Sequence, residues 1–262
     1  MKRRLISLAA APAIVAVALI ATARDANAQD RGGSLGSAHR TFESPQHFAF
    51  ELRFSPYRPD IDSDPALGGR APYAQTFGTT PRILVAAELD WQVVRIPHVG
   101  TFGPGLSVGY TSMNATAPLR NPPPPPASPL SGEQTTLSIY PFYAVAVLRA
   151  DVLMREAHIP LVPYAKAGLG YALWRASNDN GTSNHDNVPG KGHSYGTQLA
   201  LGVSLHLNAF DAYAAKEFDN TMGVNHTYLF FEYYSSNFST LGPASQLRVG
   251  ATTWAMGLAF EF

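Results

Sequence analysis

The sequence contains no cysteine, and charged residues make up only 15% of its 262 positions. Without cysteine the chain can form neither disulfides nor thiolate metal sites, so its stability must come from hydrogen bonding and packing. Acidic and basic residues balance at 19 each, and nothing in this balance suggests a nucleic-acid partner. Glycine, proline and aromatic residues are plentiful, which is typical of many strands joined by turns rather than of helices.

Residues 1–28 predict a secretory signal peptide. A basic stub precedes an apolar run from Leu5 to about Ala21, and the triplet Ala26-Asn27-Ala28 marks a cleavage site near Ala28. An uncleaved membrane anchor is the alternative, although the run is at the short limit for a membrane span. No cysteine follows the run, which argues against a lipoprotein anchor. A polar N-terminal segment covers residues 29–45, and we expect residues 46–262 to form one barrel domain.

Apolar side chains alternate with small or polar ones along much of the sequence, most clearly at its C-terminal end. Such alternation gives a strand one apolar face. A transmembrane barrel needs strands whose outer face is apolar and whose inner face is polar. We therefore expect the protein to lie in the outer membrane of a Gram-negative bacterium. We also expect the barrel assembly machinery to recognise the last strand through Trp254, Met256, Leu258, Phe260 and Phe262.

Eight alternating segments predict an all-β fold, an antiparallel up-and-down transmembrane β-barrel of about eight strands. The sixth connection is long enough to hold a short helix around Asp211 to Phe218. A soluble, lipocalin-like barrel with its apolar faces inward is the alternative. The segments cover residues 48–55, 83–93, 106–111, 135–148, 162–174, 195–207, 226–234 and 247–262.

The seventh segment is the hardest to orient. The seventh carries large apolar side chains on both faces, and its facing is left open. In the fourth, the outward face is expected to hold Leu137, Ile139, Pro141, Tyr143, Val145 and Val147. Because Pro141 removes a donor from the ladder, we expect a bulge or kink there. Aromatic residues that end the apolar faces are candidates for interfacial girdles: Trp91, Tyr110, Tyr143, Tyr171, Trp174 and Trp254.

Charged side chains on the other faces are expected to gather in the lumen. A barrel of about eight strands has little room for water inside, so opposite charges must pair across it. A structural polar core is the first interpretation, and a proton or solute path is the second. The residues concerned are Glu51, Arg53, Glu88, Asp90, Lys166, His206, Glu232 and Glu261.

An acidic run in the first outer loop resembles the start of a calcium-binding loop. Asp60, Asp62 and Asp64 stand at alternate positions, but Pro65 and Ala71 occupy the places of the turn glycine and of the bidentate glutamate. A solvated acidic loop is therefore favoured over a metal site. A weaker role in attracting cations that bridge lipopolysaccharide stays open.

Two further motifs are candidates for catalysis or binding. His193 and Ser194 are neighbours on a strand and point to opposite faces, so they cannot form a catalytic dyad. Five consecutive prolines at 122–126 predict a stiff polyproline segment in the second outer loop. This segment is interpreted as a spacer, with docking on an aromatic groove as the alternative.

Several stretches resemble a family of myxobacterial-type outer-membrane β-barrel proteins. They include FELRFSPYRPDID (50–62), LSIYPFYAVAVLRADVL (137–153), PLVPYAKAGLGYALW (160–174), HTYLFFEYY (226–234) and TTWAMGLAFEF (252–262). The resemblance implies an outer-membrane barrel and brings no established activity. PYAKAGLGY is also similar to small barrels of the hydrophobic-compound porin type, the OmpW-like proteins.

The expected function is that of a structural or surface-binding barrel that displays outer loops. A narrow OmpW-like channel for small or hydrophobic solutes is the alternative, and a lipid-modifying enzyme is a distant one. No enzyme activity and no cofactor are expected. The expected partners are outer-membrane lipid, lipopolysaccharide and the assembly machinery, and the oligomeric state is left open.

Overall fold

The computed structural model describes residues 47–118, 130–185, 188–210 and 212–262. These residues all belong to the second of two units in the chain, Phe42–Phe262. The expected signal peptide, the polar segment at 29–45 and the prolines at 122–126 lie outside the described residues. The account below concerns the second unit alone.

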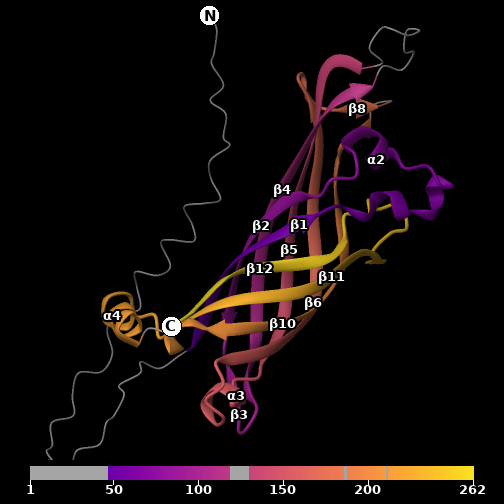
Figure 1. The fold of residues 1–262 in the computed structure, drawn as a ribbon. Coiled ribbons are helices and arrows are strands. Elements are labelled where there is room, and N and C mark those ends of the chain that lie inside the picture. Colours follow the sequence, from indigo (N-terminus) through magenta and orange to yellow (C-terminus); the bar gives the residue numbers. More distant parts are fainter. Residues whose placement is uncertain (1–46, 119–129, 186–187, 211) are drawn as a thin grey trace, which may run out of the picture. The chain divides into compact units, whose positions relative to one another are not determined.

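Eight antiparallel strands form a closed ring, which confirms the predicted barrel (Figure 1). Each strand pairs with its neighbours in sequence, β1 pairs with β12, and β10 pairs with β6 across the short strands between them. Closure leaves the ring without a free edge. The strands are β1 (Phe48–Tyr57), β2 (Arg82–Trp91), β4 (Gly100–Pro118), β5 (Leu130–Arg149), β6 (Leu161–Asn178), β10 (Lys191–His206), β11 (His226–Leu241) and β12 (Ala251–Glu261).

Short elements distinguish the two ends of the barrel. The turn end carries β3 (Val94–Ile96), α3 (Val152–Arg155), η3 (Leu207–Ala209) and α4 (Ala212–Met222), the helix expected in the sixth connection. No helix among the described residues is long and apolar enough to cross a membrane. The loop end carries η1 (Asp60–Ser63), η2 (Pro65–Leu67), α2 (Pro72–Phe77), β7 (Gly181–Thr182), β8 (Asn184–His185) and β9 (Val188–Pro189).

Side chains alternate between the inside and the outside of the ring as the sequence predicts on most strands. On β10, Leu199 and Leu201 are 62% and 70% exposed, whereas the alternating residues Gln198 and Ala200 are buried. The strand left unassigned, β11, places Phe231 and Tyr233 outside. Its buried residues alternate with them and include Phe230 and Glu232.

The predicted facing of the fourth segment is wrong. On β5 the odd-numbered residues, among them Ile139, Tyr143 and Val145, are buried inside the barrel, while Tyr140 and Phe142 are exposed outside. The reason is that the lumen at the loop end is filled by apolar side chains rather than by charges. Both faces of β5 are therefore apolar, and alternation alone cannot orient it. Tyr143 consequently packs in the apolar core, and Trp174 of β6 packs against it, so neither joins an outer girdle.

The kink expected at Pro141 is also not found. Strand β5 pairs with β4 in the same register on both sides of this residue, with Val108 opposite Phe142 and Thr111 opposite Ile139. The room for the proline ring comes from the neighbouring strand, because a Cβ on Gly109 would lie only 3.1 Å from Pro141 Cγ. The absence of a side chain at Gly109, rather than a bulge, makes room for the proline ring.

Strands β4 and β5 are longer than expected and rise beyond β1, β2 and β12 at the loop end (Figure 1). The extra residues are polar or small, such as Asn114, Thr116 and Gln134, and pair across the hairpin. Outside a membrane such residues can continue a ladder without an apolar face, which explains why alternation did not predict them.

Candidate functional site

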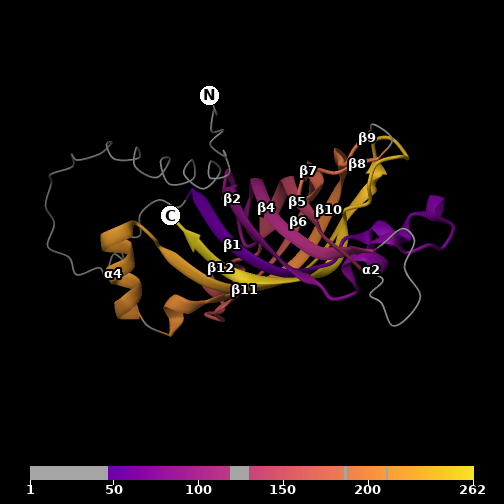
Figure 2. The same cartoon turned by 90° about the horizontal axis from the view of Figure 1, so that it is seen from above.

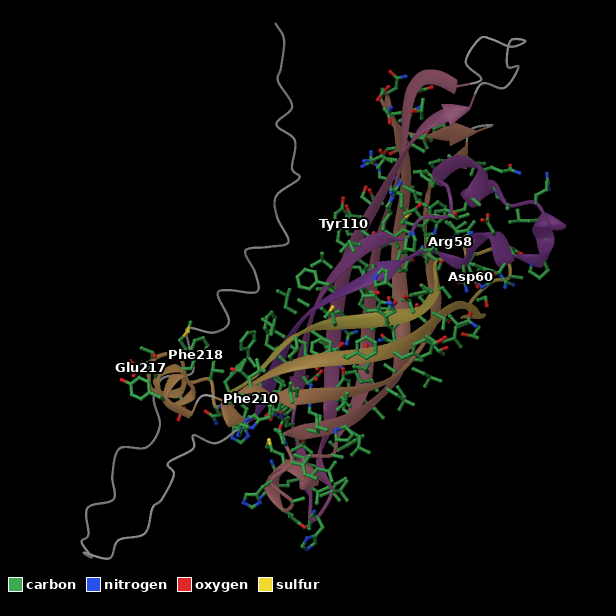
Figure 3. All side chains as sticks on the ribbon, in the orientation of Figure 1. Arg58, Asp60, Tyr110, Phe210, Glu217 and Phe218 are labelled. Carbon is green, nitrogen blue, oxygen red and sulfur yellow. The ribbon has the colours of Figure 1, made fainter. Side chains whose placement is uncertain are left out.

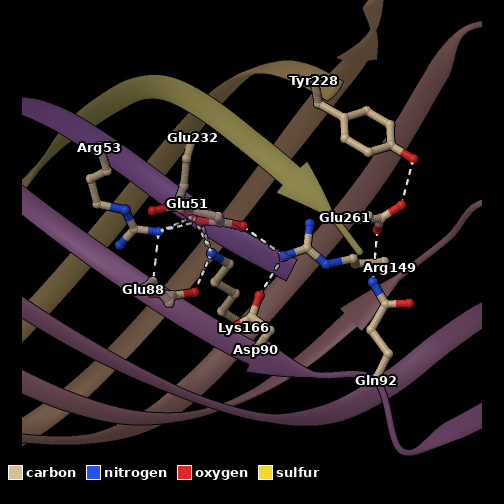
Figure 4. A network of polar contacts seen from close by, with 10 residues as sticks. All are labelled: Glu51, Arg53, Glu88, Asp90, Gln92, Arg149, Lys166, Tyr228, Glu232 and Glu261. Atoms are coloured by element: carbon tan, nitrogen blue, oxygen red, sulfur yellow. Dashed lines mark hydrogen bonds and ion pairs between the residues drawn. The ribbon is translucent and has the colours of Figure 1, made fainter. Parts of the chain in front are cut away.

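A cluster of buried charges fills the half of the lumen nearer the turn end (Figure 4). Glu51 of β1 lies at its centre. Its carboxylate accepts hydrogen bonds from Lys166 Nζ at 2.6 Å, from Arg149 at 2.7 Å and from Arg53 at 3.3 Å. These donors come from β6, β5 and β1, so one carboxylate joins strands on different sides of the ring.

Three further carboxylates surround these cations. Glu88 contacts Lys166 and lies 3.5 Å from Arg53, and Glu232 lies 3.2 Å from Arg53 and 3.6 Å from Lys166. Asp90 accepts a hydrogen bond from Arg149. The cluster therefore contains four acids against three bases, all at most 3% exposed. Because its members come from β1, β2, β5, β6 and β11, the network links five strands across the lumen.

The structure brings together six of the residues predicted for the lumen network and adds Arg149, which sequence reasoning missed. Arg149 stands on the same face of β5 as Val145 and Val147 but lies one residue beyond the predicted segment 135–148, so it was not considered for the lumen. The presence of a charge on that face was the signal that could have corrected the assignment.

His206 lies apart from the cluster, at the turn end. Its ring centroid is 4.8 Å from that of His226 and 5.3 Å from that of Tyr228. Nearby, Glu261 accepts hydrogen bonds from Tyr228 Oη and from Gln92 Nε2, both at 2.8 Å. As the last residue of β10, His206 belongs to a separate aromatic and acidic group that lines this mouth.

Three carboxylates of the cluster are close enough together to hold a metal ion. One oxygen each from Glu51, Glu88 and Asp90 lies within 4.8 Å of the others, all of them buried. However, the Lys166 ammonium and the Arg149 guanidinium already donate to these same groups. The protein's own cations therefore already pair with the carboxylates that a metal ion would bind.

Apolar side chains fill the other half of the lumen, toward the loop end. The innermost of them, Tyr57, Met113, Ile139 and Phe238, are at most 1% exposed. From the loop end, α2 adds Tyr73, whose hydroxyl donates to Met113 Sδ at 3.3 Å. Burial raises the pKa of the Tyr73 phenol above its usual range, so it stays a neutral donor. The lumen is thus packed by ions in one half and by apolar groups in the other.

Two carboxylates in the acidic run of the first outer loop accept hydrogen bonds from backbone N–H groups at the starts of short helices. Asp62 accepts hydrogen bonds from the backbone N–H groups of Tyr73 and Ala74 at 2.8 and 3.0 Å, at the start of α2. Asp64 accepts one from Ala66 N at 2.9 Å, while Asp60 is exposed. These contacts account for two of the three carboxylates without a metal ion.

We expect Asp62→Ala to lower the free energy of unfolding by about 1 kcal/mol, because it removes the acceptor for two backbone donors of α2. The exposed Asp60 is the matched control, and Asp60→Ala should leave stability within about 0.5 kcal/mol. Denaturant titrations of both variants, with calcium and with a chelator, give the comparison. A stability gain with calcium that Asp60→Ala abolishes would restore the calcium hypothesis.

His193 and Ser194 lie on opposite faces of β10, as predicted. Ser194 is fully buried and its hydroxyl donates to the carbonyl of Leu247 at 2.6 Å. His193 is exposed and stacks on Tyr171, with ring centroids 5.9 Å apart. The serine hydroxyl is directed away from the histidine, so the pair has no nucleophile-and-base geometry.

A polar crevice of about 420 Å³ opens at the loop end, between the first loop and the ends of β11 and β12. Arg58 and Asp60 border it on the loop side (Figure 3). Side-chain and backbone polar groups of both signs meet there, which suits a polar ligand better than an apolar one. The remaining lining residues are Pro59, Asp62, Ser235, Ser236, Asn237, Ala251 and Thr252.

Comparisons with known proteins give likeness at the level of the fold. Neither protein-family models nor curated proteins gave a match. Among solved structures, the chain is similar to Neisserial surface protein A, with 12% identity, a TM-score of 0.42 and coverage of 83% of this chain and 97% of that one. Ail, the attachment invasion locus protein of Yersinia pestis, shows 10% identity, a TM-score of 0.37 and coverage of 83% and 97%.

The N-terminal β-barrel domain of Pseudomonas aeruginosa OprF shows 10% identity and a TM-score of 0.37, with coverage of 83% of this chain and 100% of that domain. Likenesses this distant carry no information on function. The assignment of an eight-stranded closed barrel is based on the strand pairing in the structure.

Proposed function

We propose that this chain is an outer-membrane barrel with a sealed lumen, which anchors surface loops and binds partners at its loop end. A closed ring with an apolar outside and a charged inside suits a bilayer, because hydrocarbon cannot satisfy free backbone groups. In this orientation the turn end faces the periplasm, and the loop end, with the polar crevice, faces outward. The protruding β4–β5 hairpin then extends farthest from the membrane.

The observation that carries the proposal is the filling of the lumen. A conducting barrel needs a continuous water-filled path, whereas here the ion cluster around Glu51 and the apolar cluster around Ile139 occupy successive levels. Opening such a path would require breaking buried ion pairs or displacing packed aromatic rings. Both changes are costly, so the charges serve as structure rather than as a solute path.

Conductance across a planar lipid bilayer tests the sealed lumen. The refolded protein should give no steady single-channel current, since buried ion pairs occupy one half of the lumen and packed apolar side chains the other. The double variant Tyr57→Ala/Phe238→Ala removes two large side chains from the apolar half of the lumen. Because its ion cluster is intact, this variant should give weak current or none. Steady current through the unaltered protein, changed by Lys166→Ala, would favour the narrow OmpW-like channel instead.

The remaining assignments follow from the same proposal. Export by a signal peptide cleaved near Ala28, recognition of the Trp254–Phe262 segment by the assembly machinery and contact with lipopolysaccharide all suit an outer-membrane barrel. Membership in the myxobacterial-type barrel family is proposed on the stretches quoted above. No catalytic residue is proposed, since the histidine and serine of β10 face apart.

A further inference from the structure

We infer that α4 is an interfacial helix, which lies on the periplasmic leaflet of the membrane and directs Phe218 and Met222 toward the phospholipid acyl chains. The inference rests on the proposed membrane location of the barrel. It adds a second lipid-binding element to the wall of strands, and it commits to phospholipid, rather than to a protein, as the occupant of this helix face.

The position of α4 places it at the depth where the bilayer ends. It connects β10 to β11, and the views in Figures 1 and 2 show it to one side of the turn end. Asn208 fixes this connection, because its side chain donates to Asn225 O at 2.7 Å and accepts from Thr227 N at 3.0 Å. The helix is therefore held close to the strand ends.

The apolar side chains of this segment are exposed. Phe210 is 70% exposed, Phe218 43% and Met222 69%. Phe218 and Met222 are four residues apart, so they lie on the same face of the helix, while Glu217 faces elsewhere. Figure 3 shows Phe210, Glu217 and Phe218 together at this corner of the molecule. Large apolar groups left in water at one end of a helix need a partner.

Continuity with the barrel wall identifies that partner as lipid. The outward residues of the two flanking strands, including Val203 on β10 and Leu229 on β11, are 37% and 41% exposed and lead down to the connection. The helix has 11 residues, about 16 Å in length, too short to span but long enough to lie in the headgroup region. An apolar helix face beside a lipid-facing wall meets the same lipids.

The absence of cysteine allows a direct test by single-cysteine spin labelling. Phe218→Cys, Glu217→Cys and Leu201→Cys are each refolded as the full chain into vesicles of phosphatidylethanolamine and phosphatidylglycerol. Collision rates of each label with oxygen, which concentrates in lipid, and with a water-soluble nickel complex are then measured. The ratio of oxygen to nickel collisions should be high at Leu201 and Phe218 and low at Glu217.

The three labels separate failure of the inference from failure of the proposed function. A low ratio at Phe218, equal to that at Glu217, with a high ratio at Leu201, would overturn the interfacial helix and leave the barrel in the membrane. A low ratio at Leu201 would overturn the membrane barrel itself. Shielding of the Phe218 label from both reagents would overturn the inference too, because it would mean that protein covers this face.

Discussion

Replacing Lys166 with methionine should lower the free energy of unfolding by about 3–5 kcal/mol, because it leaves buried carboxylates without their shared cation. Lys166 is 2% exposed and lies within 3.6 Å of Glu51, Glu88 and Glu232. After the substitution, four acids face only two bases inside the lumen. Urea titration of the barrel refolded in vesicles measures the change, and a heat-dependent shift in gel mobility reports whether the ring still closes.

Two further variants distinguish loss of charge pairing from loss of packing. Lys166→Met together with Glu88→Gln removes one charge of each sign, so the double variant should be more stable than Lys166→Met alone. The exposed pair of Arg95 and Asp151, 2.7 Å apart, is the matched control. Arg95→Ala should cost at most about 1 kcal/mol, as surface ion pairs do. Equal losses for Lys166→Met and Arg95→Ala would show that the cluster does not hold the strands together.

Replacing Leu201 with arginine should cost about 2–4 kcal/mol in a bilayer, because it puts a charge against hydrocarbon. Leu201 is 70% exposed on the outer face of β10, so the new side chain meets no packed neighbour. In a soluble barrel the same change would place a charge in water and leave stability almost unaltered. Refolding yields and urea midpoints in vesicles therefore separate the two environments.

Leu241 supplies the control for this prediction. Its side chain is 40% exposed, like the outward apolar residues of the barrel wall. However, it is the last residue of β11, at the loop end, and lies beyond the expected bilayer. Leu241→Arg should therefore change stability by less than about 0.5 kcal/mol. A neutral effect at both positions would argue against a membrane-facing wall.

Much of the fold could be predicted from the sequence because water and lipid act on opposite faces of a strand. Where charges mark one face, as Glu51 and Arg53 do on β1 or Glu88 and Asp90 on β2, the facing was predicted correctly. The predicted segment 135–148 of β5 lacks this contrast, since Val145 and Val147 pack inside while Phe142 lies outside. Period-two alternation cannot tell two apolar faces apart.

The candidate site was predicted in its composition more than in its geometry. The residue types on the inward faces indicated a charge network, but the pairing of Arg149 with Asp90 depends on where β5 and β2 meet across the lumen. The capping role of Asp62 likewise depends on α2 folding back onto the loop. Both are tertiary contacts between distant segments, which no local pattern specifies.

The pairing of β1 with β12 has a consequence for the order of folding. Phe50 lies opposite Phe260, so the seam of the ring joins residues near opposite limits of the barrel sequence. Such a contact forms only after a large loss of chain entropy, and folds rich in contacts of this kind form slowly. Strands β1 to β11 can pair one after another, but both outer strands keep an open edge until β12 docks. The barrel is therefore most prone to aggregation just before closure, and a chaperone that shields β1 during this interval would raise the yield of folded protein.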